Sequence, residues 1–104
     1  ARDYGKDNIR ANTVCPGWVD TPMIEGALEA LSRIHRITRD DAKRILTRWS
    51  PLRRMSEPVE LANCVTFLVS SAASFVTGAV LIADGGQSIV ALGLLPLDPD
   101  AGIV

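Results

Sequence analysis

Residues 8–23 constrain the fold of this chain more than any other stretch. A short run of mixed polar and apolar residues over 8–15 ends at Pro16-Gly17, a pair that breaks regular structure, and Thr21-Pro22 follow shortly after. Threonine is favourable immediately before a helix, and proline fits the first helical position. The pattern therefore predicts a strand, a tight loop and a new helix, with Thr21 as the helix cap.

The apolar run at residues 79–83 predicts a second strand of a different kind. It is continuous rather than alternating, and Gly78 and Asp84-Gly85-Gly86 bound it. Such runs are typical of strands buried on both faces, as in a parallel sheet. The Asp-Gly-Gly sequence favours a turn that ends this strand over a metal site.

Periodic apolar positions predict three helices between these strands. The first covers residues 22–36, the second begins at a capping box over residues 38–41 and ends at Pro51, and the third covers residues 57–70. Residues 1–4 are predicted to end an earlier helix, with Gly5 as its stop. The expected apolar stripes are Ile24, Leu28, Leu31 and His35, then Ala42, Ile45, Leu46 and Trp49, then Leu61, Val65, Leu68 and Val69.

The composition suits one domain and indicates neither a membrane nor a nucleic-acid partner. The chain has 104 residues, 47% of them hydrophobic, and a net charge of −1. No long uninterrupted apolar segment is present. Cys15 and Cys64 lack any metal-binding spacing, so we interpret them as reduced thiols packed on a strand and a helix. A cytoplasmic location is the expectation.

The motif Asn12-x-x-x-Pro16-Gly17-x-Val19-x-Thr21-Pro22 resembles the segment after the sixth strand of short-chain dehydrogenases/reductases. Further pieces resemble that family in the same order, so the resemblance covers about residues 1–88. These pieces are Ala1-Arg2-Asp3-Tyr4-Gly5 at a helix end, Glu57-Pro58-Val59-Glu60-Leu61-Ala62 at the start of the last large helix, and Phe75-Val76-Thr77-Gly78 with Asp84-Gly85-Gly86 around the final strand. Each is weak alone, but in register they make a specific signal.

The resemblance implies an α/β fold, the C-terminal fragment of a Rossmann-type doubly wound parallel sheet with two strands, the lid helices and the last large helix retained. Residues 1–90 would belong to the NAD(P)-binding domain, and residues 91–104 would form a disordered or subunit-crossing tail. The chain has no Gly-rich turn after an early strand and no Tyr-x-x-x-Lys, since Asn8 stands four residues after Tyr4. We therefore expect the C-terminal part of a longer enzyme, inactive on its own.

The same resemblance implies a cofactor site in the loop after the first strand. Pro16-Gly17 would lie against the nicotinamide, main-chain atoms of Val19 would bond the carboxamide, and the Thr21 hydroxyl would reach the carboxamide or pyrophosphate. A carboxamide needs one donor and one acceptor in fixed geometry. Asn12 is interpreted as structural, tying the strand to a loop. Trp18 and Met23 would border the substrate or simply pack, and NAD and NADP both remain open as cofactors.

Residues 33–54 form a basic segment with eight cationic and two acidic side chains, a net charge of +6. A solvated helical face is the simpler interpretation. The alternative is a docking surface for phosphate-bearing acyl carriers, as suits a resemblance to 3-oxoacyl carrier-protein reductases. His35, within this segment, is interpreted as a surface or lid residue rather than a catalyst.

Two functions follow from these observations. The first is part of an NAD(P)-dependent oxidoreductase that transfers hydride between nicotinamide and a carbonyl or secondary alcohol. Its partners would be a small carbonyl or acyl substrate and further copies of itself in a dimer or tetramer. The second is a non-catalytic truncated family member that acts only in oligomerisation or partner binding.

Overall fold

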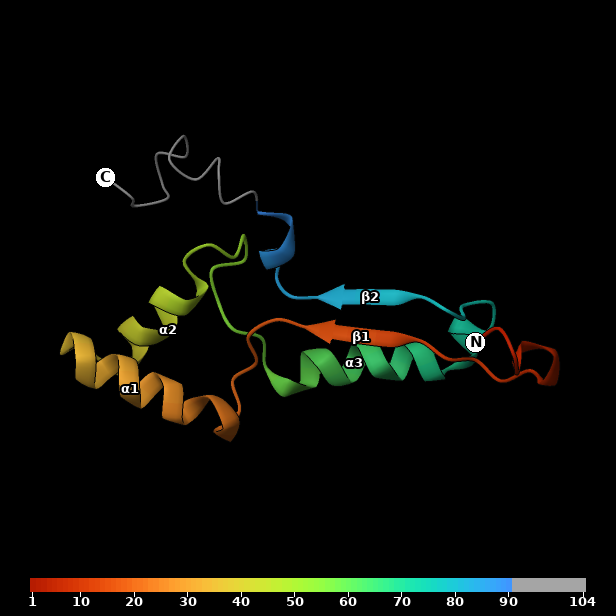
Figure 1. Ribbon diagram of the computed structural model, residues 1–104, viewed down its shortest axis with the longest axis horizontal. Helices are drawn as coiled ribbons and strands as arrows, with labels where there is room; N and C mark the ends of the chain where they lie inside the picture. Colours follow the sequence, from red (N-terminus) through yellow and green to blue (C-terminus); the bar gives the residue numbers. More distant parts are fainter. Residues whose placement is uncertain (91–104) are drawn as a thin grey trace.

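The computed structural model describes residues 1–90, so the predicted tail at 91–104 lies outside the described residues. Two lobes are evident (Figure 1). The sheet lobe consists of β1 (Thr13–Pro16), β2 (Val80–Ala83) and α3 (Pro58–Val69). The lid lobe consists of α1 (Glu25–His35) and α2 (Arg39–Thr47), which project beyond the carboxyl ends of the strands.

The two strands pair in parallel, which confirms the predicted parallel sheet. Thr13 lies opposite Val80 and Cys15 opposite Ile82. The first strand is shorter than the predicted 8–15, because Asn8 adopts a left-handed conformation with φ 59° and regular pairing begins only at Thr13.

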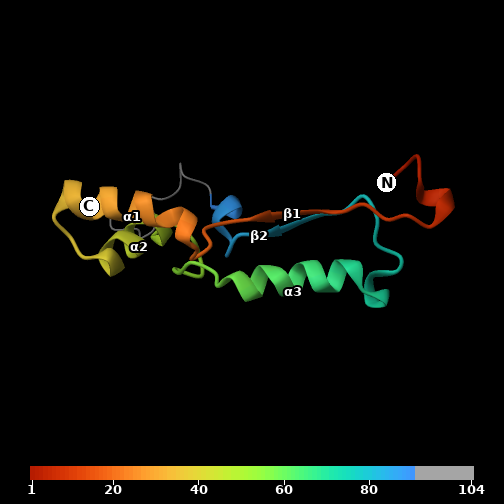
Figure 2. The same cartoon turned by 90° about the horizontal axis from the view of Figure 1, so that it is seen from below.

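Only one face of this small sheet is covered within the described residues. In Figure 2, α3 lies along one face and nothing lies along the other. Val80 and Ile82 remain 63% and 55% exposed on the bare face, which Thr13 and Cys15 share with them. The prediction of a second strand buried on both faces is therefore wrong for the described chain.

The two thiols differ in their surroundings. Both are free, as predicted, and Cys64 is half-buried on α3. Cys15 is exposed, so the prediction that it packs on its strand is wrong. The reason is again the bare face, which leaves every second residue of β1 without a neighbour above it.

Two side chains of the segment before β1 form hydrogen bonds to the end of α3 and to the loop that leads into β2. The Arg10 guanidinium donates to the carbonyls of Leu68 at 2.6 Å, Val76 at 3.1 Å and Ser70 at 3.3 Å. These include carbonyls at the end of α3, where helix geometry leaves acceptors without partners. Asn12 donates to Val76 O and accepts from Ala79 N, both at 3.0 Å, which confirms its predicted structural role.

The third helix, α3, lies where it was predicted, but part of its predicted apolar stripe is exposed. It begins at Pro58, a favourable first position, and ends at Val69. Leu68 is buried, whereas Val65 and Val69 are 47% and 74% exposed because no described element covers them. Residues 1–4 are not helical, which is a further correction: Gly5 begins a short 3₁₀ turn (Gly5–Asp7) instead of ending a helix.

The lid lobe has its own small core. Leu28 and Ala42 are fully buried, Met55 is buried to all but 8%, and five partly buried side chains pack around them: Trp18, Ile24, Leu31, Ile37 and Leu46. The predicted first helix is a 3₁₀ turn (Pro22–Ile24) that continues into α1. The predicted capping box is confirmed, since Thr38 Oγ1 accepts from Asp41 N at 3.1 Å and the Asp41 carboxylate accepts from Thr38 N at 3.3 Å.

Some residues of the apolar stripes that were predicted for the two lid helices are not buried. The second helix ends at Thr47 rather than at Pro51, since a residue that precedes proline disfavours helical geometry and the last turn unwinds. Trp49 therefore falls outside the helix, and Ile45 is 36% exposed. Thr47 is buried instead, its hydroxyl donating to Lys43 O at 2.9 Å. His35 is exposed and contributes nothing to the core.

Candidate functional site

The loop after β1 is held against β2 on one side. Gly17 N donates to Ala83 O at 3.2 Å, which extends the strand pairing by one residue. A Cβ placed on Gly17 would lie 2.8 Å from Asp84 Cα and 2.9 Å from Asp84 O, closer than real contacts allow. Glycine is therefore required here, and the main chain of this loop is fixed in position.

On its other side the loop pairs with the segment that leads into α3. Val19 and Ser56 form an isolated parallel bridge, in which Ser56 N donates to Trp18 O and Asp20 N donates to Ser56 O, both at 2.9 Å. This pairing uses the carbonyl of Trp18 and the N–H of Asp20, and it does not use the main-chain groups of Val19 itself. Among residues 1–90, the Val19 N–H and C=O have no hydrogen-bond partner, so one donor and one acceptor remain available on a fixed backbone.

Thr21 is not the side-chain cap that the sequence predicts. Its hydroxyl accepts no capping bond, because Ile24 N already donates to the Thr21 carbonyl at 3.1 Å within the tight 3₁₀ turn. The contrast with Thr38, whose hydroxyl does cap a helix, is direct. Thr21 therefore presents a half-buried hydroxyl that the local fold does not use.

Trp18 and Met23 lie in very different surroundings. Trp18 packs against the lid core and also lines a pocket of about 190 Å³ together with residues from the start of α3 and the end of β2. Its indole Nε1 is buried and has no hydrogen-bond partner among the described residues. Met23 is 93% exposed at the start of the lid.

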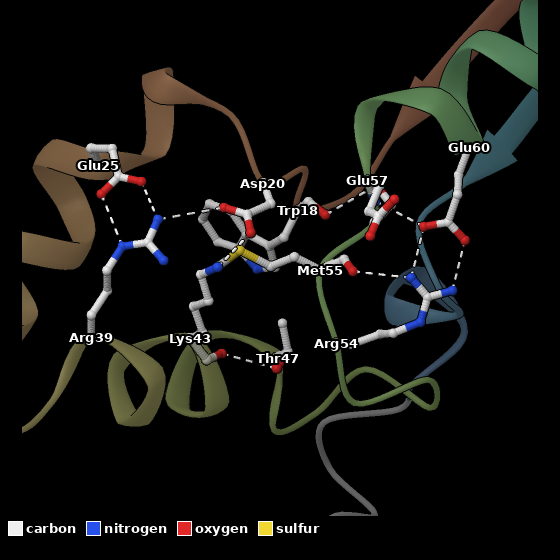
Figure 3. Close-up of polar contacts among 11 residues, drawn as sticks. Trp18, Asp20, Glu25, Arg39, Lys43, Thr47, Arg54, Met55, Glu57 and Glu60 are labelled. Atoms are coloured by element: carbon white, nitrogen blue, oxygen red, sulfur yellow. Dashed lines mark hydrogen bonds and ion pairs between the residues drawn. The ribbon is translucent and has the colours of Figure 1, made fainter.

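Four charged side chains join the loop to the lid (Figure 3). Asp20 receives a hydrogen bond from Lys43 Nζ and lies 3.6 Å from Arg39 Nη2, while Arg39 also pairs with Glu25. The Lys43 hydrogen bond is the main reason that the pKa of Asp20 lies below its usual range. Sequence reasoning missed this network, since Asp20 and Lys43 are far apart in the chain and belong to no shared motif.

A second ion pair fixes the segment that carries Ser56. Arg54 donates two hydrogen bonds to the Glu60 carboxylate at 2.7 Å each, and Glu57 N donates to the same carboxylate at 2.8 Å. These bonds, the Arg54 pair first, lower the pKa of Glu60 to about 2. The pairing holds the first turn of α3 beside the loop, as Figure 3 shows.

The Asp84-Gly85-Gly86 sequence forms a turn, as predicted. The Asp84 carboxylate accepts from Gly86 N at 2.8 Å and from Ser88 N at 2.7 Å, and bonds from Ser88 are the main cause of its lowered pKa. Gly85 and Gly86 have φ of 65° and 86°, which favours glycine at both positions. No cluster of three or more metal-binding side chains occurs in residues 1–90.

Half of the cations of the basic segment are already paired. The partners are Glu25 for Arg39, Asp20 for Lys43, Asp41 for Arg44 and Glu60 for Arg54. Arg48 lies over the Trp49 ring at 4.5 Å from its centre. Much of the charge counted from the sequence is thus balanced locally, partly by carboxylates outside the segment.

Comparison with known proteins places this geometry in a family. Residues 1–88 match the family model described as enoyl-(acyl carrier protein) reductase. Protein MoaE of Klebsiella aerogenes is 44% identical over 90 residues, which cover 86% of this chain and 35% of that protein. The 2,5-dichloro-2,5-cyclohexadiene-1,4-diol dehydrogenase of Sphingobium indicum is 44% identical over 92 residues, 86% of this chain and 33% of that enzyme.

Solved structures agree. A short chain dehydrogenase family protein from Francisella tularensis superposes with a TM-score of 0.80 at 37% identity, over 86% of this chain and 37% of that one. The fold is thus a piece of a dinucleotide-binding α/β sheet, and the chain belongs to the short-chain dehydrogenase/reductase family. It spans about a third of the length of the curated relatives that it matches. In the described part, none of the helices has the length and apolar character to cross a membrane.

Proposed function

We propose that this chain supplies the nicotinamide-side loop and the substrate lid of an NAD(P)-dependent oxidoreductase. The observation that carries the proposal is the pair of unused main-chain groups on Val19, next to the unused hydroxyl of Thr21. A nicotinamide carboxamide offers one acceptor and two donors, which this set complements. The cofactor would supply the hydride chemistry, and this loop would orient its ring.

The cofactor contacts are proposed residue by residue. Pro16 and Gly17 would lie against the ring, since the close approach to Asp84 fixes their backbone. Val19 would bond the carboxamide through its N–H and C=O, and Thr21 through its hydroxyl. No catalytic residue is proposed within this sequence, because it holds no Tyr-x-x-x-Lys pair, and the chain alone is expected to be inactive.

Relatives with bound cofactor support both nicotinamide forms. L-sorbose reductase from Gluconobacter frateurii, with a TM-score of 0.79 at 28% identity over 86% of this chain and 35% of that one, was solved with NADPH and L-sorbose. A 4-hydroxyisoleucine dehydrogenase mutant was solved with NADH and succinate. We propose NAD or NADP for this chain, and a small carbonyl compound or secondary alcohol as the substrate.

The acyl-carrier alternative remains part of the proposal in a narrower form. Carboxylates already pair with Arg39, Lys43, Arg44 and Arg54, so a carrier would have to meet the other cations or compete with Asp41 for Arg44. Arg44 and Arg48 are the two that we propose, because both are exposed and lie four residues apart. Their substitution by glutamate would weaken use of a carrier-bound substrate but not of a small ketone.

A second function has one observation in its favour. The bare face of the sheet, with Val80 and Ile82 largely exposed, is the kind of surface that another polypeptide covers. A non-catalytic member that binds a full-length relative would use it. Cofactor binding separates this function from the first.

The test uses a swapped enzyme, defined as Protein MoaE with its matched stretch replaced by residues 1–90 of this chain. Thr21→Val removes the free hydroxyl at nearly constant size and should raise the NADH or NADPH dissociation constant roughly two- to twelvefold, the effect of one neutral hydrogen bond. Thr38→Val is the matched control, because Thr38 caps a helix and its loss should lower the melting temperature while changing cofactor affinity less than Thr21→Val does. Equal cofactor affinity in the wild-type and Thr21→Val proteins would refute the role of Thr21.

A further inference from the structure

We infer that Asp20 is a positioning residue, whose carboxylate latches the lid lobe to the loop that carries Val19 and Thr21. This inference rests on the proposed function for its consequence in catalysis, but the latch itself is a property of the described chain. Figure 3 shows the carboxylate pointing from the loop to the lid, toward Lys43 and Arg39 of α2. Asp20 lies between the two residues whose free groups define the proposed cofactor site.

Both the main chain and the side chain of Asp20 form hydrogen bonds, which distinguishes it from an ordinary surface acid. Its main-chain N–H donates to Ser56 O at 2.9 Å, so its backbone is fixed to the segment before α3. Its side chain bonds Lys43, whose own side chain is only 23% exposed. A displacement of α2 would therefore pull on a residue whose backbone is part of the loop.

The network also reaches the other lid helix. Arg39, at the start of α2, lies 3.6 Å from Asp20 and pairs with Glu25 at the start of α1. One carboxylate thus connects the loop to α2 directly and to α1 through a shared arginine. Since α1 and α2 also pack on each other through Leu28 and Ala42, loss of the network should lower the local stability of both helices together.

The geometry predicts what the latch does to the proposed site. With the ion pairs formed, the lid stays close to the loop, and the backbone groups of Val19 keep one orientation. With the pairs broken, the lid core persists, because its apolar contacts do not involve Asp20. The result would be a folded molecule whose lid helices open locally more often, rather than an unfolded one.

Amide hydrogen exchange on this chain, followed by mass spectrometry, tests the latch directly. Asp20→Asn should speed exchange in both α1 and α2 by about two- to fivefold at low salt, in keeping with the energies of partly exposed ion pairs. The difference should shrink in about 1 M salt, where charge attraction is screened. Lys43→Arg should retain slow exchange, since it keeps the cation.

The matched control is Arg44→Gln, on the same helix but paired with Asp41 of that helix. It should leave α1 exchange unchanged, because it removes a local pair that does not reach the loop. Three results would overturn the latch: unchanged lid exchange in Asp20→Asn, an equal change in Arg44→Gln, or an equal change throughout α3, which would indicate general destabilisation.

The swapped enzyme then separates the latch from the proposed function. If both hold, Asp20→Asn raises the cofactor dissociation constant, by at most about two- to fivefold, which is the full energy of such an ion pair, and Lys43→Arg does not. Cofactor binding that is unaffected by Asp20→Asn would overturn the positioning role while leaving the proposed function intact. A folded swapped enzyme that binds neither NADH nor NADPH would instead refute the proposed function.

Discussion

The two lobes of this chain differ in how well their apolar side chains are buried. The lid lobe buries Leu28, Ala42 and Met55 among five further apolar side chains, and ion pairs join it to the loop. The sheet lobe buries Leu68 and Ala73, and is held mainly by main-chain pairing and by Arg10 and Asn12. The lid lobe therefore has a packed core, whereas one apolar face of the sheet lobe remains exposed among the described residues.

The overall dimensions reflect this difference. The radius of gyration is 17.7 Å, against about 13 Å for a compact domain of 100 residues. The principal extents of 55 × 33 × 21 Å describe two lobes joined at the loop after β1, as Figure 1 shows. The proposed cofactor loop lies at this junction, so its geometry depends on both lobes.

The largest expected effect is on the core of the lid. Leu28→Ala removes the fully buried side chain at its centre and should cost the lid about 2–5 kcal/mol. Ile34→Ala, on the same helix but 69% exposed, should cost far less. Amide exchange in α1 and α2 would measure both. Slow lid exchange in Leu28→Ala would show that the lid is held by its ion pairs rather than by its core.

The next largest effect is a loss of stability in the sheet lobe when Arg10 is replaced. Arg10→Met keeps an apolar stem but leaves the carbonyls of Leu68, Ser70 and Val76 without their shared donor. We expect a loss of about 1.5–3 kcal/mol, the range for hydrogen bonds to charged groups. Faster exchange should be confined to α3 and β2. An equal loss in the lid would mean that the two lobes unfold together.

The smallest effect is a pH dependence at the start of α3. The pKa of Glu60 falls to about 2 beside Arg54, from an ordinary value of 4.5. A lowered pKa stabilises the folded form above 4.5, and this contribution is lost as the pH falls from 4.5 toward 2. Glu60→Gln should flatten the acid dependence of exchange in the first turn of α3, while Glu29→Gln, on an exposed part of α1, should not. An unchanged acid profile in Glu60→Gln would show that the pair with Arg54 does not stabilise this turn.

Sequence reasoning succeeded where structure is determined locally or by a motif. The capping box at Thr38 and the Asp84 turn each depend on a few neighbouring residues, and both are confirmed. The parallel pairing of strands that are distant in the chain was predicted from the apolar run and the family resemblance, and it is confirmed as well. The family motif also predicted that Asn12 ties strand to loop, which its two hydrogen bonds confirm.

Several of the failures involve contacts between distant parts of the chain. Nothing in the spacing indicates that Arg10 meets the end of α3, or that Asp20 meets Lys43. The capping role predicted for Thr21 failed because the tight 3₁₀ turn uses its carbonyl instead of its hydroxyl. The continuous apolar run at residues 79–83 predicts burial without saying which element provides it, whereas the expectation of a fragment with only two strands of the sheet agrees with the bare face.

Steady-state oxidation of NADH and NADPH with a panel of small ketones tests the central claim most directly. The swapped enzyme and this 104-residue chain would be assayed side by side, together with intact Protein MoaE. We predict turnover by the swapped enzyme and none by the chain alone, since we propose that this chain supplies the nicotinamide-side loop and its sequence holds no Tyr-x-x-x-Lys pair. Robust turnover by the chain alone, or a folded swapped enzyme that uses neither cofactor while intact Protein MoaE does, would contradict the account.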